Sequence, residues 1–449
     1  MITINQQPPE ITPVYNDIVM TVVSDKIISK FKNKYVFDIF GIQQSNLTTP
    51  TGVAVYLGRV KSTPNPAGYG MLDLSRYLQT ILEPEMTETP EQNITVVGTN
   101  TVTVASGYYY VICGEEYSET ENGPVTLYNG NGTVSSGTTL TSLVSETMFM
   151  FNGVNQFEEG LNWNATGYFL PTGRTLLTNS PRTLYKETDE FITLGAFSGY
   201  YSGSTISPNP GSAPNSLPLR ATVYNSSGSV IKSFQGLTNT FSQSPTNKSM
   251  SMCCAYIDTI VTPYESSWNK IDVKLGPVSG STSFTGSTET ITIYKKECPW
   301  KKYDPIDIMF LNRLGSWDFF RFFGSKDEDV KIERGTYQRQ YGTWSSINYS
   351  YNTNERGTSN IKTDLTLQGE IMSDFLDQDT VNWLEELLTS PEVFIVGDFN
   401  TGGTTKKLIP ISITDSNFKR QVKGNRKLRQ VSFKYEYATQ IRTQQTGRP

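Results

Sequence analysis

Runs of apolar or alternating residues, none longer than a β-strand, recur along the whole chain, and turn-forming residues separate them. The N-terminal part contains four such runs: ITPVYNDIVMTVVS, KYVFDIFGIQ, GVAVYLGRVK and GYYYVICGEEY. Val, Ile, Thr, Tyr and Phe pack well on a pleated surface, while Gly, Pro, Asn and Ser supply turns. The pattern predicts a mainly β, multi-domain chain of β-sandwich or β-barrel units with a few short helices.

The 449-residue length suggests about three domains, at roughly 150 residues per domain. Changes in the density of strand-like runs and of Gly/Ser/Pro segments give the boundaries. We expect an N-terminal β-sandwich with one helix at 1–118 and a loop-rich aromatic connecting segment at 119–187. A second β-sandwich is expected at 188–298, and a C-terminal β-barrel or sheet with one helix at 299–449.

Two segments show helical spacing, and two others predict turns. MLDLSRYLQTIL at 71–82 has leucines and isoleucine on one face, with Asp73 or Ser75 as its cap. DQDTVNWLEELLTS at 377–390 has the same pattern, with Asp377 or Asp379 as its cap and Pro391 as its stop. A hairpin turn is expected at 225–229, and the NGNGT run is interpreted as turns and not as a phosphate loop.

The segment IDIMFLNRLGSWDFFRFFGS, residues 306–325, carries the densest group of aromatic rings. An active-site wall, a sugar platform and a subunit contact are the alternatives for it. We predict a structural and interaction role, with Trp317 and Phe320 burying apolar surface and Arg313 and Arg321 pairing with nearby carboxylates.

Charge is distributed unevenly along the chain, whose formal net charge is −5. From residue 406 to the C-terminus the chain has eleven lysines and arginines and two acidic residues, which gives a local net charge of +9. We expect this basic end to meet an acidic face of a neighbouring subunit. Nucleic acid is the competing partner, but no nucleic-acid-binding motif accompanies the charges. The candidate interaction residues here are Lys419, Arg420, Arg426, Lys427 and Arg429, and Lys423 belongs to the same basic cluster.

Histidine is absent, which removes the usual general base and the commonest metal ligand. The four cysteines lack the spacing of a zinc site or redox pair, and Cys253 with Cys254 is expected to lie in an apolar strand. We therefore expect no enzyme activity, no cofactor and no bound metal. A carboxylate-only glycosidase is the remaining catalytic alternative, and its candidate residues are Asp307, Asp318, Glu158 and Glu159.

Oxygen-rich acidic runs could suggest calcium, but the offsets of a calcium loop are missing. We interpret Asp327–Asp329 as a charged hairpin tip. Sugar binding without catalysis is a further alternative, but for each single ring we favour a place in an aromatic core. The candidate platforms are Trp163, Tyr168, Trp268, Trp300, Trp317 and Trp344.

The N-terminal MITINQQPPEITPVY lacks the basic and apolar regions of a signal peptide, and no apolar run reaches about 18 residues. We therefore expect synthesis in a cytoplasm without membrane insertion.

Three groups of segments resemble a protein family. The first is QQPPEITPVYNDIVMTVVSDK with PNPAGYGMLDLSRYLQTIL. The second is FMFNGVNQFEEGLNWNATGYFLPTGRTLLTNSPRTLYKETDEFITL. The third is CPWKKYDPIDIMFLNRLGSWDFFRFFG with DTVNWLEELLTSPEVFIV. Together they resemble β-rich virion structural proteins of tailed phages of Bacteroidota, of the crAss-like or flavobacterial type.

The resemblance implies a non-enzymatic virion component that is synthesised in the host bacterial cytoplasm and forms a ring subunit of the tail, neck or baseplate. Its partners would be other virion proteins and copies of itself. The alternatives are a fibre or receptor-binding protein that recognises a host-surface glycan, and a capsid decoration protein. The resemblance carries no catalytic residues onto this sequence.

Overall fold

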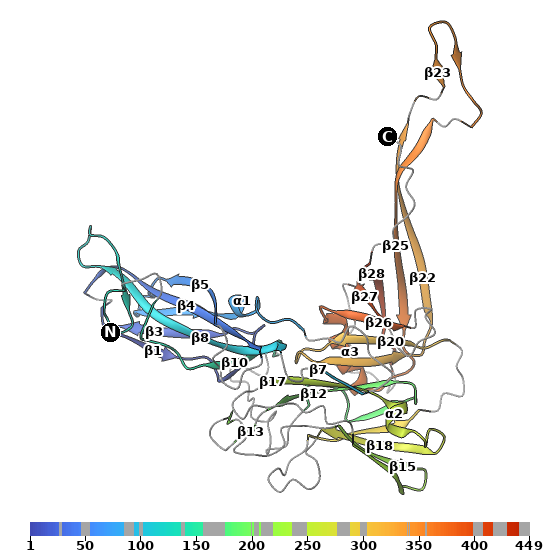
Figure 1. Cartoon of the computed structure of the whole chain (residues 1–449), viewed down its shortest axis with the longest axis horizontal. Coiled ribbons are helices and arrows are strands. Elements are labelled where there is room, and N and C mark those ends of the chain that lie inside the picture. The colour runs from blue at the N-terminus through green and yellow to red at the C-terminus, as the bar shows by residue number, and fades with distance from the viewer. Residues whose placement is uncertain are drawn as a thin grey trace. The chain divides into compact units, whose positions relative to one another are not determined.

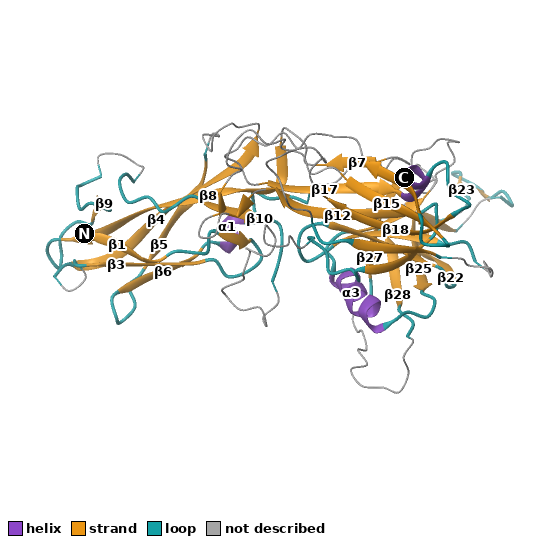
Figure 2. Cartoon of the chain, turned by 90° about the horizontal axis from the view of Figure 1, so that it is seen from below, coloured by secondary structure: helices purple, strands orange, loops and turns teal. Residues whose placement is uncertain are grey.

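The computed structural model describes residues 1–26, 29–45, 54–84, 94–97, 102–135, 140–155, 176–198, 200–201, 206–207, 219–235, 249–275, 288–296, 303–338, 340, 342–354, 357–397, 407–415 and 429–439. The described residues fall into two compact units. Unit 1 takes in Met1–Glu297 and Leu311–Phe319, and unit 2 takes in Cys298–Phe310, Phe320–Asn400 and Lys407–Pro449. Strands make up most of the ribbon (Figure 2), which confirms the prediction of a mainly β chain built from several sheets.

The N-terminal part of unit 1 is a two-layer β structure. One sheet has the order β1-β3-β6, with bounds Ile2–Gln6, Val19–Ser24 and Tyr69–Asp73. The other has the order β2-β10-β8-β4-β5, with bounds Ile11–Pro13, Met148–Phe151, Val102–Ser118, Phe31–Ser45 and Val55–Ser62, and β9 (Thr126–Asn129) pairs with β8. Inward side chains of both sheets form one buried cluster that includes Met20, Val22, Phe37, Ile39 and Val111.

The helix expected at 71–82 is much shorter in the structure. Its first residues belong to β6, and α1 spans only Ser75–Leu78. The Asp73 carboxylate accounts for this, since Oδ1 accepts hydrogen bonds from the backbone N–H groups of Ser75 and Ile18 and thereby holds the end of the strand. The helical prediction was therefore wrong in extent, although Leu74 and Leu78 are buried as the apolar spacing indicates.

The second sandwich of unit 1 packs a five-stranded sheet on a three-stranded sheet. The larger has the order β11-β19-β18-β15-β16, with bounds Thr183–Lys186, Ile291–Lys295, Trp268–Leu275, Leu219–Asn225 and Val230–Gln235. The smaller has the order β12-β17-β7, with bounds Phe191–Ser198, Ser249–Tyr256 and Ile94–Val97. The short helix α2 (Ile257–Val261) adds Ile257 and Ile260 to their shared core. A separate two-stranded pair joins β13 (Tyr200–Tyr201) to β14 (Ile206–Ser207).

Two local expectations for this sandwich are confirmed. β15 and β16 form the hairpin predicted at 225–229, where Asn225 Oδ1 accepts from the backbone N–H groups of Ser227 and Ser229. Cys253 and Cys254 lie in β17. One strand comes from far away in the sequence, because β7, at 94–97, pairs antiparallel with β17.

Unit 2 is organised on a seven-stranded sheet with the order β21-β20-β26-β27-β28-β25-β22. The bounds in that order are Trp317–Phe322, Ile306–Leu311, Val393–Gly397, Lys407–Ile413, Ser432–Tyr437, Thr358–Met372 and Lys326–Gln338. The edge strands β21 and β22 are consecutive in the chain, so the sheet must curl enough for the three residues between them to reach across, about 14 Å. The described residues show no pairing between these two edges, so the sheet is curled without barrel closure.

Helix α3 (Gln378–Thr389) packs on the concave core of this sheet and confirms the predicted C-terminal helix. Asp377 is its N-cap, with the side chain accepting from the Thr380 backbone N–H at 2.8 Å. The helix buries Val381, Trp383 and Leu384 against the cluster of strand side chains.

Candidate interaction surfaces

The aromatic segment Ile306–Ser325 forms β20, a tight turn and β21. Asn312 organises the turn, because its Oδ1 accepts from the backbone N–H groups of Leu314 and Ser316. Trp317 is only 1% exposed, while Phe320 is half-buried against the core of unit 2 and Arg313 is half-buried. These rings therefore serve as packing surface within the chain, which agrees with the structural part of the predicted role, and the interaction part stays a prediction.

Arg321 forms a buried, bidentate ion pair with Asp307. Its Nε donates to Oδ1 at 2.6 Å and its Nη2 donates to Oδ2 at 2.8 Å, with the side chains 2% and 5% exposed. Asp318, also buried, accepts from the Thr178 hydroxyl at 3.0 Å. Both carboxylates of the aromatic segment are therefore held by structural partners and closed to solvent. Glu158 and Glu159, the other glycosidase candidates, lie outside the described residues.

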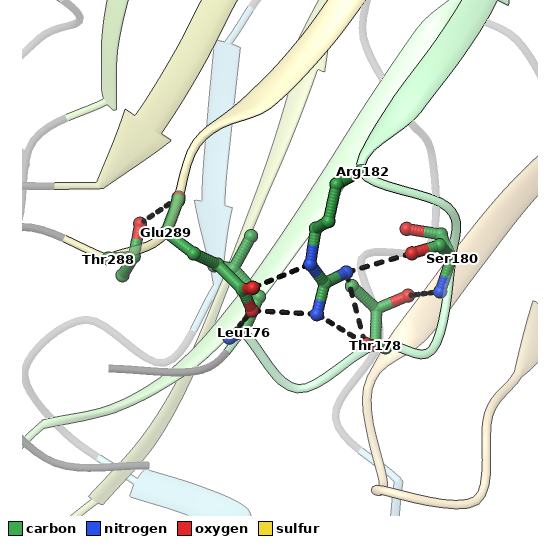
Figure 3. Close-up of polar contacts among 6 residues, drawn as sticks. All are labelled: Leu176, Thr178, Ser180, Arg182, Thr288 and Glu289. Atoms are coloured by element: carbon green, nitrogen blue, oxygen red, sulfur yellow. Dashed lines mark hydrogen bonds and ion pairs between the residues drawn. The ribbon is translucent and has the colours of Figure 1, made fainter. Parts of the chain in front are cut away.

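A second polar network joins residues 176–182 to the segment leading into β19 (Figure 3). Arg182 donates from Nε to Glu289 Oε2 at 2.6 Å and from Nη2 to Oε1 at 2.7 Å. Its Nη1 also donates to the Ser180 carbonyl, and the Leu176 backbone N–H donates to Glu289 Oε1. Because each charged group is satisfied by fixed neighbours, this network is a structural clamp.

The other groups considered as reactive sites are buried. Burial raises the pKa of the Cys113 thiol to about 12 and that of Cys254 to about 12, which keeps both in the unreactive thiol form. Within the described ranges, no group of three or more Cys, Asp or Glu side chains is arranged to hold a metal ion. No described helix is long and apolar enough to cross a bilayer.

The acidic run Asp327–Asp329 is not a hairpin tip, so that expectation was wrong. It lies in β22, where Asp327 pairs with Glu370 and Asp329 with Gln368. The strand continues because Val330 and Ile332 alternate with charged residues, a pattern compatible with a ribbon that has one apolar face.

The proposed sugar platforms and basic residues differ in their exposure, and several lie outside the described residues. Trp268 and Trp317 are buried, and Trp344 is 72% exposed. Trp163, Tyr168 and Trp300 lie outside the described residues, as do Lys419, Arg420, Lys423, Arg426 and Lys427. Arg429 is half-buried, and its backbone exchanges two hydrogen bonds with Leu376 at 2.7 and 3.0 Å.

An exposed feature of unit 2 is the ribbon of β22 and β25, called the arm below and defined as the described residues of the range 330–367. Figure 1 shows the two strands running side by side beyond the rest of their sheet, with β23 (Thr343–Trp344) at the far end. β28 pairs with β25 only from Gln368 to Met372, so the described arm has no third strand. Two-stranded ribbons of this kind are only marginally stable in water.

The strand register gives the arm two different faces. Directly opposed residues share a face, so Val330 with Leu367 and Ile332 with Leu365 form an apolar face. It continues the face of the sheet that carries the buried Ile371. The charged face has Glu333 opposite Asp364, and each acid is paired within its own strand, to Lys331 at 2.8 Å and to Lys362 at 2.6 Å. The arm is thus amphipathic near its base, where two apolar pairs lie on the core-facing side, and Arg334 opposite Thr363 is the next pair on that face.

The tip of the arm, residues 342–354, contains no charged residue. Trp344 is 72% exposed and Ile347 is 84% exposed, at a turn closed by hydrogen bonds between Ser345 and Asn348. β24 (Tyr349–Ser350) pairs with β23, and the rings of Tyr349 and Tyr351 extend the aromatic surface from Trp344 at centroid distances of 6.2 Å. Exposed Trp and Tyr on an uncharged surface are typical of protein interface centres.

The strand pattern of both arm segments can be read from the sequence, but their pairing into one ribbon was not predicted. The signal was present in KDEDVKIERGTYQ and TSNIKTDLTLQGEIM, two long alternating segments around an uncharged, Gly- and Asn-containing stretch. The sequence pattern could not show that, among the described residues, β28 pairs with β25 only from Gln368 to Met372.

No protein-family model matches the chain, and a search of curated proteins finds no match. The fold and surfaces described above are therefore the basis for the functional argument, together with the sequence resemblance.

Proposed function

We propose that the chain is a non-enzymatic structural subunit of a tailed-phage virion, placed in a ring of the tail, neck or baseplate. The sequence resemblance supports the class of particle. The single structural observation that carries the assembly role is the arm, a two-stranded ribbon with an exposed apolar face and an uncharged aromatic tip.

The physical reason is that the arm leaves large apolar side chains exposed to water. Val330, Ile332, Trp344 and Ile347 each expose more than two-fifths of their surface in the single chain. Burial of such side chains against another protein removes apolar area from water at about 25 cal/mol per Å². A virion subunit obtains this burial on assembly, so the arm is suited to contact a neighbouring virion protein.

The charged face of the arm serves a complementary purpose. Its paired lysines and acids discourage uncontrolled strand-to-strand association before assembly. The contact we propose therefore uses the apolar face and the tip, and leaves Lys331, Glu333, Lys362 and Asp364 on the opposite face.

The test is complementation of a phage that lacks this gene with the Trp344→Ser/Ile347→Ser double variant. Tyr15→Ser, which removes a half-exposed ring from unit 1, is the matched control. Replacing an interface hot spot typically costs about 2 kcal/mol or more of binding free energy. Each of the two substitutions should therefore weaken the contact roughly 30-fold or more. We expect a folded variant, shown by circular dichroism and melting, that is missing from purified particles.

Two outcomes contradict this proposal. Normal incorporation with normal infectivity would show that the tip is not an assembly contact. Normal incorporation with lost adsorption to host cells would favour the alternative of a receptor-binding protein, in which Trp344 contacts a host-surface glycan. Cryo-electron microscopy of the complemented particles would place the subunit at the tail, neck, baseplate or capsid surface.

A further inference from the structure

The outer face of the five-stranded sheet in unit 1 carries a row of aromatic rings that the sequence patterns did not predict. Tyr185, Tyr294, Lys270 and Tyr224 occupy directly opposed positions on four neighbouring strands, so they lie in one line on one face. The rings of Tyr185 and Tyr294 have centroids 5.8 Å apart and planes 27° from parallel. Lys270 Nζ lies 4.8 Å from the centroid of the Tyr224 ring.

This row is open to solvent. Tyr185 is 63% exposed and Tyr294 is 36% exposed, while the alternate residues Ile271 and Ile293 are buried in the sandwich core. The sheet thus buries one face in its core and presents three tyrosines and one lysine in a row on the other. Exposed rings aligned across strands offer a flat surface for stacking.

A polar row lies two residues along the strands from the aromatic row. Asp272 is its centre, opposed by Thr222 on one side and Thr292 on the other. Thr292 Oγ1 donates to Asp272 Oδ1 at 2.8 Å, and Lys270 Nζ donates to Oδ2 at 2.9 Å. Carboxylate oxygens accept more than one hydrogen bond each, so Asp272 keeps acceptor capacity toward solvent.

A pair of cations forms the third row. Arg220 and Lys274 are directly opposed, both half-buried, and within the described part of the chain neither forms an ion pair with a carboxylate. Like charges in opposed positions are unfavourable unless an anion lies between them. Counting Lys270 and Asp272, the face has a formal charge of +2. The face is therefore complementary to an acidic ligand.

We propose that this face binds an acidic oligosaccharide. The tyrosine row stacks on the apolar faces of the sugar rings. Asp272 and the threonines form hydrogen bonds with sugar hydroxyl groups, and Arg220 with Lys274 forms ion pairs with a carboxylate or sulfate. Four residues of strand separate Lys270 from Lys274, about 13 Å, so a ligand touching both ends must contain several sugars. Asp272 accepts hydrogen bonds from hydroxyl groups, which sugars supply and a DNA phosphodiester backbone does not, and this favours a saccharide over DNA.

The inference is independent of the arm, because every residue it uses lies in unit 1. Its test uses the full chain in isothermal titration against oligogalacturonate, alginate and heparin oligosaccharides, with a neutral cello-oligosaccharide and oligo(dT) for comparison. The variants are Tyr185→Ala/Tyr294→Ala and Arg220→Gln/Lys274→Gln, with Tyr15→Ala as the matched control.

We expect at least one acidic oligosaccharide to bind, at least tenfold more weakly in both double variants and unchanged in the control. Its affinity should fall in 0.5 M salt, where exposed charges are screened over only a few ångströms, roughly 4 Å.

Three results would overturn the proposal. They are no binding of any acidic probe at millimolar concentration, equal binding of the neutral probe, and binding of oligo(dT) that the same variants abolish. Self-association of the wild-type chain that both variants remove, seen by analytical ultracentrifugation, would instead assign the face to a contact between copies.

Discussion

The buried Asp307–Arg321 pair allows a sharp test of how unit 2 is held together. Replacing Asp307 by Asn keeps the shape of the side chain but leaves the Arg321 guanidinium, 2% exposed, without its counter-charge. Removing one partner of a buried ion pair typically costs about 3–5 kcal/mol. The equilibrium constant for opening this part of unit 2 should therefore rise roughly 160- to 5,000-fold.

The double variant Asp307→Leu/Arg321→Met separates the cost of an unpaired charge from the value of the pair. Both charges are then absent, and apolar side chains of similar length occupy the space. Such replacements are often neutral or stabilising by about 1–4 kcal/mol, because the desolvation cost of both ions disappears. We therefore expect the double variant to be at least as stable as the wild type and much more stable than Asp307→Asn.

Hydrogen exchange of the full chain, followed on peptides from β20, β21 and β26, reports the opening free energy where the pair lies. Lys362→Gln is the control, because Lys362 and Asp364 form an exposed ion pair whose loss should leave these peptides unchanged. Protection of Asp307→Asn equal to that of the wild type would refute the reasoning. A double variant less stable than the single one would refute it as well.

Four further outcomes follow from the burial of particular groups. Trp317→Ala should lower the free energy of unfolding by about 3–5 kcal/mol in urea titrations, since the ring is 1% exposed; wild-type stability would contradict this. Burial raises the pKa of Glu115, so the ionised carboxylate destabilises the folded state. This destabilisation is absent below about pH 4 and grows as the pH rises to the raised pKa. Glu115→Gln should therefore raise the melting temperature at pH 7 and leave it unchanged at pH 3.5, and equal shifts at both would rule this out. Native Cys113, Cys253 and Cys254 should resist iodoacetamide at pH 8 in mass-spectrometric mapping, because burial raises the pKa of each thiol; rapid labelling of any of them would be inconsistent with the core. Thermal melts with and without EDTA should coincide, and a large downward shift would reveal a structural metal.

The sequence alone determined the features that depend on residues close together in the chain. Strand-length alternation predicted the β class, and the Asn225–Ser229 turn and the α3 helix with its Asp377 cap were each readable from a few neighbouring residues. In these cases the decisive hydrogen bonds join a side chain to a backbone group two to four positions away, so local spacing carries the information.

The tertiary structure decided what depends on pairing between distant strands. The β7–β17 pair, the Asp307–Arg321 bond and the tyrosine row all require partners that lie from 14 to more than 100 residues apart. The same holds for the late start of α1, where the Asp73 contact with Ile18 keeps the first residues of the helical pattern in β6. Strand register selects which side chains share a face, and many registers satisfy the same alternation of apolar and polar residues. Only the folded chain therefore shows that β22 and β25 extend as an uncovered arm, and that three tyrosines from different strands form one surface.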